Sequence, residues 1–187
     1  MSETVTRTSG ISRWNLDPAH SQVEFGVRHM MISTVKGSFD ELEGEVELNG
    51  DDFAQSRVSV EIDASSIDTG NEDRDQHLRS EDFLDVDEFP ALSFRSTKVE
   101  GTEDSFRLPG DLTIRGETRE VVLKGKLLGG GTDPWGNERL AFRAQTTVNR
   151  KDFGLTWNQA LEAGGVLVGD EVEITLEVQA VEAQEEE

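Results

Sequence analysis

The run QVEFGVR at residues 22–28 alternates apolar side chains with polar or small ones. Val23, Phe25 and Val27 fall on one face, which is the period-two pattern of a strand with one buried side. The same alternation returns in seven further segments: 42–48, 58–62, 92–94, 112–114, 121–127, 140–148 and 172–178. In most of them acidic residues take the outward positions. The sequence therefore predicts an all-β protein of about eight strands.

These segments are not separated by long helical stretches, so the chain lacks the strand–helix–strand rhythm of a parallel sheet. The remaining choices are an antiparallel barrel and an antiparallel sandwich. A barrel has no exposed edges, and about eight strands leave room inside for side chains or for one small ligand. Alternation alone does not choose between the two architectures.

Residues 69–90 break the alternation and read TGNEDRDQHLRSEDFLDVDEFP, a stretch that is dense in charge. Thr69 and Glu72 have the spacing of a capping box, and Ser80 followed by two acidic residues is typical of a second helix start. Pro90 sets a stop for any helix that begins there. We expect one or two short helices in this stretch, crossing one end of the sheet.

The chain of 187 residues has 39 acidic and 18 basic side chains and a formal net charge of -21. A surface this negative repels nucleic acid, so we expect no nucleic-acid partner. Residues 153–161 carry no charge, but this run is far shorter than the roughly 20 residues that a membrane helix needs. The first ten residues lack the apolar segment of a signal peptide, and cysteine is absent. These features predict a cytoplasmic protein without a membrane span. We expect its barrel domain at residues 12–181, with disordered tails at 1–11 and 182–187.

Two ionisable side chains continue the apolar face of a strand. His29 comes two residues after Val27, and Arg150 comes two residues after Val148. An ionisable group in such a position belongs where the interior meets an opening, because deeper burial without a partner is costly. The other interpretation is that each of them pairs with one of the many carboxylates.

Arg74 and His77 are three residues apart, so the predicted helix presents them on one face. In a very acidic protein they would form a small cationic patch that suits a phosphate or another polar headgroup. A solvated, charged helix without a ligand is the other interpretation.

Motifs for catalysis and metal binding are missing from the sequence. It has three histidines and no HExxH, GxSxG, P-loop or EF-hand pattern. His20 and Glu24 form the one near pair of potential ligands, and two ligands do not make a metal site. No serine lies in a nucleophile motif, and cysteine and tyrosine are absent. We therefore expect no catalytic residue, no metal and no cofactor.

Three segments together resemble the YceI-like family: WNLDPAHSQVEFGVRHMMISTVKGSF at 14–39, NEDRDQHLRSEDFLDVDEFPALSF at 71–94 and NRKDFGLTWN at 149–158. The resemblance runs in order from about Trp14 to Val181, nearly the whole chain. It implies an extended, lipocalin-like antiparallel barrel with a long interior pocket. Members of the family hold polyisoprenoid chains there, such as prenyl diphosphates or the tail of a quinone.

Two sets of site residues follow when this resemblance is combined with strand alternation. The apolar pocket would be lined by Phe25, Val27, Met31, Phe39, Val60, Phe94, Phe142 and Trp157. The headgroup would lie near His29, Arg74, His77, Arg150 and Asn158.

The leading hypothesis is a non-catalytic protein that binds or carries a long-chain isoprenoid, either a polyprenyl diphosphate or an isoprenoid quinone. One alternative is an enzyme that acts on such a lipid, with His29 or His77 as its acid or base. Another is a barrel with a filled interior that serves as a structural or stress-related module. A homodimer is expected from the analogy with the family alone.

Overall fold

The structure is a computed structural model that describes residues 10–161 and 165–183. The described residues form twelve strands, one α-helix and four short 3₁₀ helices. The strands are β1 (Ile11–Leu16), β2 (Gln22–His29), β3 (Ser33–Phe39), β4 (Leu42–Asn49), β5 (Arg57–Asp63), β6 (Ile67–Asp68), β7 (Ala91–Ser96), β8 (Glu100–Thr102), β9 (Ser105–Ile114), β10 (Glu117–Thr132), β11 (Glu138–Asn149) and β12 (Val168–Glu182). The helix α1 is Glu72–Arg79, and the 3₁₀ helices are Pro18–His20, Phe53–Gln55, Ala64–Ser66 and Arg150–Phe153.

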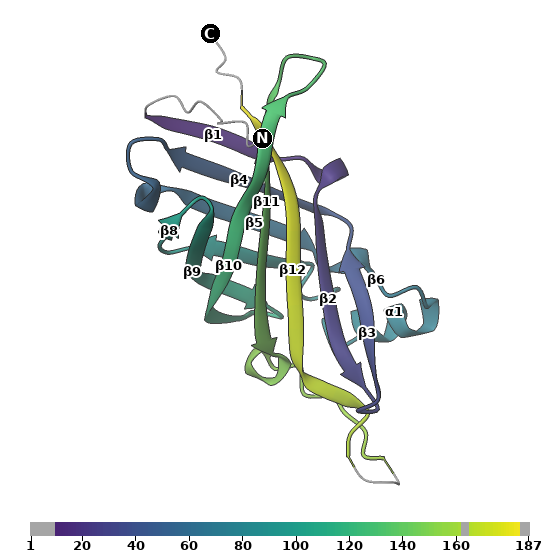
Figure 1. The fold of residues 1–187 in the computed structure, drawn as a ribbon. Coiled ribbons are helices and arrows are strands. Elements are labelled where there is room, and N and C mark those ends of the chain that lie inside the picture. Colours follow the sequence, from purple (N-terminus) through teal and green to yellow (C-terminus); the bar gives the residue numbers. More distant parts are fainter. Residues whose placement is uncertain (1–9, 162–164, 184–187) are drawn as a thin grey trace.

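Eight of the strands close an antiparallel ring in the order β1-β4-β5-β7-β9-β10-β11-β12. The ring closes where β1 pairs with β12, with Trp14 opposite Glu182 and Leu16 opposite Ala180. Because β12 is 15 residues long, its residues 168–177 can pair with a further strand, β2. Beyond this seam β2, β3 and β6 extend the sheet (Figure 1). The predicted antiparallel barrel is confirmed, and with it the choice against a sandwich.

Strand alternation decides which side chains face the interior. In the pairing of β2 with β12, Phe25 lies opposite Ile174, and both pack against the hydrophobic core. Glu24 and Glu173, the residues that precede them, are exposed. The same division repeats along most strands of the ring, because successive side chains of a strand point to opposite faces of the sheet. The result is an apolar interior inside an acidic outer surface.

The charged stretch after β6 contains one α-helix, at the lower limit of the one or two predicted. α1 begins after Asn71, whose side-chain oxygen accepts a hydrogen bond from a backbone N–H of the first turn at 3.1 Å. The capping-box prediction is wrong, because Thr69 instead donates its hydroxyl to Asp75. Ser80 ends the helix, and turns follow it instead of a second helix.

The two ends of the chain differ slightly from the predicted tails. Residues 1–9 and 184–187, where most of the tail prediction falls, lie outside the described residues. β1 starts at Ile11 and β12 reaches Glu182, because both residues pair in the sheet. The barrel therefore extends one residue beyond the predicted domain on each side. No helix in the described ranges is long and apolar enough to cross a membrane.

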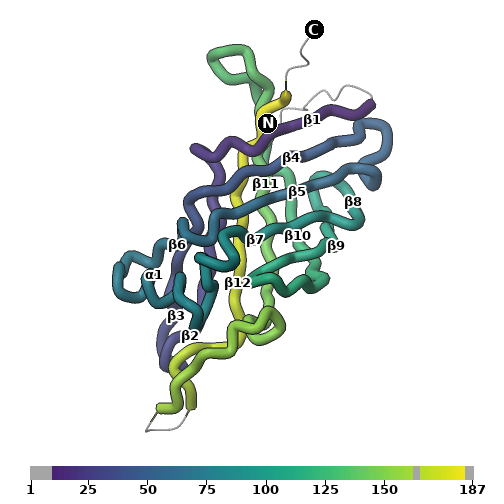
Figure 2. The backbone as a smooth tube through the Cα atoms, turned by 180° about the vertical axis from the view of Figure 1, so that it is seen from behind, coloured from purple at the N-terminus to yellow at the C-terminus, as the bar shows by residue number. Residues whose placement is uncertain are grey.

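The barrel has two distinct ends (Figures 1 and 2). The start of β1, the end of β12 and the β10–β11 hairpin lie at one end, which we call the terminal end. The β2–β3 hairpin and the connection from β11 to β12 lie at the other, which we call the loop end. α1 lies beside β3 and β6, outside the strands and on the side of the loop end.

Candidate ligand-binding site

A cavity of about 550 Å³ occupies the part of the barrel toward the loop end. Its wall consists of side chains from nine strands, from α1 and the segments on either side of it, and from the connection between β11 and β12. Apart from Thr146 on β11, the polar lining residues come from the end of β2, from α1 and the residues before it, and from the 3₁₀ helix after β11. The cavity is thus apolar in its depth and polar at one end.

A second cavity of about 70 Å³ lies toward the terminal end. Val60, Phe94, Leu123 and Leu176 line both cavities and form the boundary between them. The ring of Phe94 lies against Gly110, where a Cβ atom would come within 2.5 Å of the ring. The missing side chain at Gly110, on the neighbouring strand β9, therefore leaves the space that this ring occupies.

The structure places six of the eight predicted lining residues on the main cavity: Phe25, Val27, Phe39, Val60, Phe94 and Trp157. Phe142 lines the second cavity instead. Met31 lines neither cavity, because β2 ends at His29 and the chain then turns at Met30 and Met31. Alternation holds only within a strand, so it gives no information on Met31, which is 63% exposed.

Arg74 is held at the polar end of the cavity by the segment that precedes α1. Its Nε donates to the Thr69 hydroxyl at 2.7 Å, and its Nη2 donates to the Thr69 carbonyl at 2.8 Å. Thr69 is fixed in turn by the buried carboxylate of Asp75, which accepts from its N–H and its hydroxyl. In the described part of the chain, no carboxylate forms an ion pair with Arg74 within 4.0 Å. The Nη1 group of Arg74 has no hydrogen-bond partner among the described residues either.

His77 lies one helical turn further along α1 and also lines the cavity. Its Nε2 is 2.8 Å from Asp82 Oδ2. The imidazole meets the rings of Trp157 and Phe83 edge to face, with centroids 4.6 and 5.1 Å away. These contacts fix the plane of the imidazole. His29, half-buried at the end of β2, lines the same polar end, so the structure brings His29, Arg74 and His77 to one cavity.

Arg150 also lines the cavity, but it is 3% exposed and its donors are largely occupied. Its guanidinium donates to the carbonyls of Leu155, Trp157, Val168 and Gly169, at 2.6 to 3.3 Å. Burial lowers the pKa of Arg150, against the attraction of a nearby aspartate. Alternation thus predicts its inward direction, but the side chain mainly holds the connection between β11 and β12 in place.

Asn158 does not line the cavity. Its side-chain amide donates to the Val168 carbonyl at 2.7 Å, and its oxygen accepts from the Val168 N–H at 3.0 Å. It therefore supports the same connection as Arg150. Residues that the sequence reasoning missed include Phe83 and Leu167, which line the cavity from irregular segments without a period. Among the described residues, no group of three or more His, Cys, Asp or Glu is placed to bind a metal ion.

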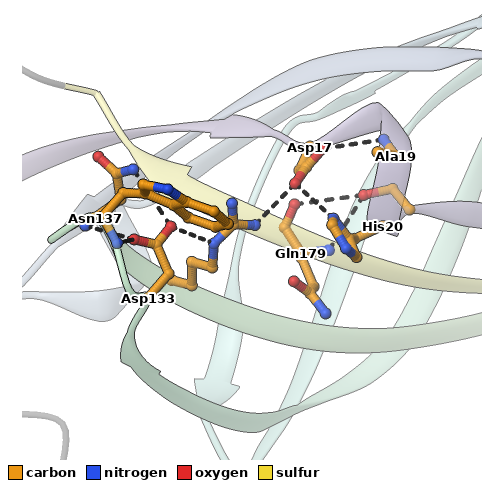
Figure 3. Close-up of polar contacts among 9 residues, drawn as sticks. Asp17, Ala19, His20, Asp133, Asn137 and Gln179 are labelled. Atoms are coloured by element: carbon orange, nitrogen blue, oxygen red, sulfur yellow. Dashed lines mark hydrogen bonds and ion pairs between the residues drawn. The ribbon is translucent and has the colours of Figure 1, made fainter.

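An ion-pair network lies at the terminal end, and Figure 3 shows its polar contacts. Arg139 on β11 donates from Nη1 to Asp17 and from Nε to Asp133, both at 2.8 Å. His20 Nδ1 lies 2.8 Å from the same oxygen of Asp17. The hydrogen bonds from Arg139 lower the pKa of both carboxyl groups to about 2. The network ties the chain after β1 to the β10–β11 hairpin, next to the seam of the barrel.

Comparison with known proteins extends over nearly the whole chain. A UPF0312 protein of Staphylococcus aureus is 40% identical over 163 residues, which are 87% of this chain and 93% of that protein. A UPF0312 protein of Yersinia enterocolitica is 36% identical over 165 residues, which are 88% of this chain and 83% of that protein.

Solved structures share the fold. Burkholderia cenocepacia BcnA superposes with a TM-score of 0.76 at 21% identity, covering 88% of this chain and 98% of that one. The Campylobacter jejuni YCEI protein gives 0.71 at 27% identity, covering 84% and 90%. A polyisoprenoid binding domain from Saccharophagus degradans gives 0.65 at 14% identity, covering 91% and 98%. The model of the YceI-like domain matches residues 14–180. The barrel, the segments that make it and these relatives agree, and the chain belongs to the YceI-like family.

Proposed function

We propose that this protein binds a long-chain isoprenoid lipid and acts as a carrier without catalysing a reaction. The tail would lie in the main cavity, with the headgroup among His29, Arg74 and His77. The proposal depends on one observation, a 550 Å³ cavity with an apolar depth and its polar side chains gathered at one end. A lipid with a long apolar tail and a compact polar head matches this arrangement. The likeness of the fold to a polyisoprenoid binding domain supports the same class of ligand.

The cavity volume limits the length of tail that fits. A cavity of about 150 Å³ holds one benzene molecule, with its six carbons. On this scale, the 550 Å³ of the main cavity takes about 20 carbons, or about four isoprene units. A longer tail must pass Phe94 into the second cavity or extend out of the polar end.

An anionic headgroup that enters the cavity is repelled by the net negative charge of the protein. A net charge of -21 repels an anionic group at long range, so its local partners must be cations or polar donors. Arg74 supplies such a donor, because its Nη1 group has no partner among the described residues. A diphosphate would accept charge-assisted hydrogen bonds from it, whereas a quinone carbonyl would form weaker, neutral-acceptor bonds. Arg74 therefore favours a diphosphate more strongly than a quinone.

Native mass spectrometry of the protein as purified tests the proposal, because it reports the mass of a bound lipid and the number of subunits together. We expect a bound lipid whose extract contains an isoprenoid chain. Val60→Gln should abolish this binding, because it puts an amide without partners into the apolar wall. Ser59→Gln is the matched control, since Ser59 is exposed on the same strand. A folded Val60→Gln protein with the wild-type lipid content would contradict the proposal.

A second candidate function rests on the 2.8 Å contact between His77 and Asp82 at the cavity. A carboxylate in this position can orient an imidazole that acts as a general base. Incubation with geranylgeranyl diphosphate, followed by analysis of the released phosphate and of the lipid, tests for turnover. Turnover that His77→Gln removes would make the protein an enzyme, and quantitative recovery of the substrate would support the carrier.

A further inference from the structure

Four apolar side chains are exposed together at the loop end. Met30, Met31 and Ile32 form the tip of the β2–β3 hairpin and are 43%, 63% and 78% exposed. Val166, in the connection from β11 to β12, is 40% exposed. The hairpin and this connection lie side by side in both views (Figures 1 and 2). We call these four residues the apolar tip.

The apolar tip adjoins the polar end of the cavity. The Met30 N–H donates to the Leu167 carbonyl at 2.8 Å, which joins the hairpin to the connection. Met31 packs over Gly165, where a Cβ atom would be 2.6 Å from the methionine sulfur. His29 and Leu167, which adjoin the tip residues in sequence, line the cavity. The exposed apolar surface is therefore continuous with the wall of the ligand site.

The backbone of the tip is in a conformation that its side chains disfavour. Met30 has a φ of 53° and Met31 a φ of 59°, and the Ile32 N–H closes the turn on the His29 carbonyl at 3.2 Å. A tight hairpin turn with two positive φ angles favours Asn-Gly, and other side chains are strained there. Residues strained in this way cluster at functional sites, where the surrounding structure holds them in place. Here the strained positions present two large apolar side chains to solvent.

The charge around the hairpin differs from that of the rest of the protein. The 39 acidic residues make up about a fifth of the 187-residue chain, yet the fifteen positions from 25 to 39 contain none. The same segment has Arg28, His29 and Lys36. An apolar hairpin tip in a segment that has cations and no acidic residue suits the headgroup region of a bilayer, which is often anionic.

We propose that the apolar tip inserts into a lipid bilayer and that the ligand passes between the bilayer and the cavity while it is inserted. This inference rests on the proposed function, because only a ligand with a water-insoluble tail needs such a contact. At physiological salt the Debye length is about 8 Å. The charges near the tip, rather than the net charge of the whole chain, therefore govern the contact with headgroups.

The double variant Met30→Asn/Met31→Gly provides the test, because it removes both side chains and supplies the turn residues that the backbone favours. We expect its melting temperature to equal or exceed that of the wild type. Its cosedimentation with phosphatidylcholine vesicles that contain phosphatidylglycerol should fall at least tenfold. The control is Trp135→Ser, which removes an 80% exposed aromatic side chain from the β10–β11 hairpin at the terminal end. Its vesicle binding should equal that of the wild type.

The other outcomes separate the two proposals. A wild-type protein that carries lipid by native mass spectrometry but does not bind vesicles would overturn the bilayer contact and leave the lipid-binding proposal standing. An equal loss of vesicle binding in Trp135→Ser would also overturn it, because the contact would not depend on the tip. If the wild type were a dimer that does not bind vesicles, and if the double variant were a monomer, a second copy of the chain would cover the tip. Wild-type vesicle binding without any lipid in the cavity would instead contradict the proposed function.

Discussion

Replacing Phe94 by alanine should lengthen the isoprenoid tail that the barrel accepts. Phe94 is 4% exposed and lies between the 550 Å³ and 70 Å³ cavities. On the benzene scale used above, the second cavity adds room for about three carbons and the removed ring for about six. The variant should thus accept one to two additional isoprene units. It should also lose about 3–5 kcal/mol of stability, as is usual for a phenylalanine removed from a core.

Isothermal titration calorimetry with geranyl, farnesyl, geranylgeranyl and farnesylgeranyl diphosphate measures this effect. Each isoprene unit that enters the cavity buries apolar carbons worth on the order of 3 kcal/mol, or about a hundredfold in affinity. For the wild type, affinity should rise steeply to geranylgeranyl diphosphate and then level off. For Phe94→Ala it should continue to rise at farnesylgeranyl diphosphate.

Leu140→Ala is the control for lost stability, because Leu140 is 4% exposed but lines neither cavity. It should lower the melting temperature without changing the dependence on tail length. If folded Phe94→Ala protein reached its limit at the same tail length as the wild type, the tail would not extend toward Phe94.

Three further predictions concern the charged groups. Acid should destabilise the protein as the pH falls from about 4 to about 2, because the pKa values of Asp17 and Asp133 are lowered from 3.8 to about 2 in the fold. Thermal melts should show that Arg139→Met lowers stability at pH 7 and weakens this acid dependence. Arg74→Ala should reduce the affinity for a prenyl diphosphate by roughly ten- to a hundredfold, and less for a quinone, as titration calorimetry can show. Arg95→Ala is the control for Arg74→Ala, because Arg95 is exposed. An equal loss of affinity in the two variants would show that the headgroup lies in solvent. Arg150→Ala should mainly lower the melting temperature, because it leaves four carbonyls without their donor.

The sequence predicts the barrel because alternation is a local property that burial on one face enforces along every long strand. It does not predict β3, whose inward positions include Gly37. The ring of Phe25 takes the space of the missing side chain there, with a Cβ distance of 2.5 Å. Such an arrangement depends on two strands at once, so the composition of either strand alone does not reveal it.

For the candidate site, the sequence predicts which way a side chain points better than it predicts what that side chain binds. Alternation correctly turns Arg150 inward, but the carbonyls that it binds come from residues 155–169, whose path no periodic pattern describes. Arg115 has a partner of the same kind, because its guanidinium donates to the carbonyl of Phe83 on the cavity wall at 3.0 Å, 32 residues away in sequence. A side chain's partners are settled by tertiary contacts, and these follow from the fold.

The seam between β1 and β12 also has a consequence for folding order. It joins three pairs of residues, from Trp14 with Glu182 to Leu16 with Ala180, so its partners are separated by almost the full length of the chain. Contacts this distant are slow to form, because a long loop must close before they stabilise anything. During synthesis the ring cannot close until Ala180 has left the ribosome. Until then the apolar interior stays open along this side, between strands that later become neighbours.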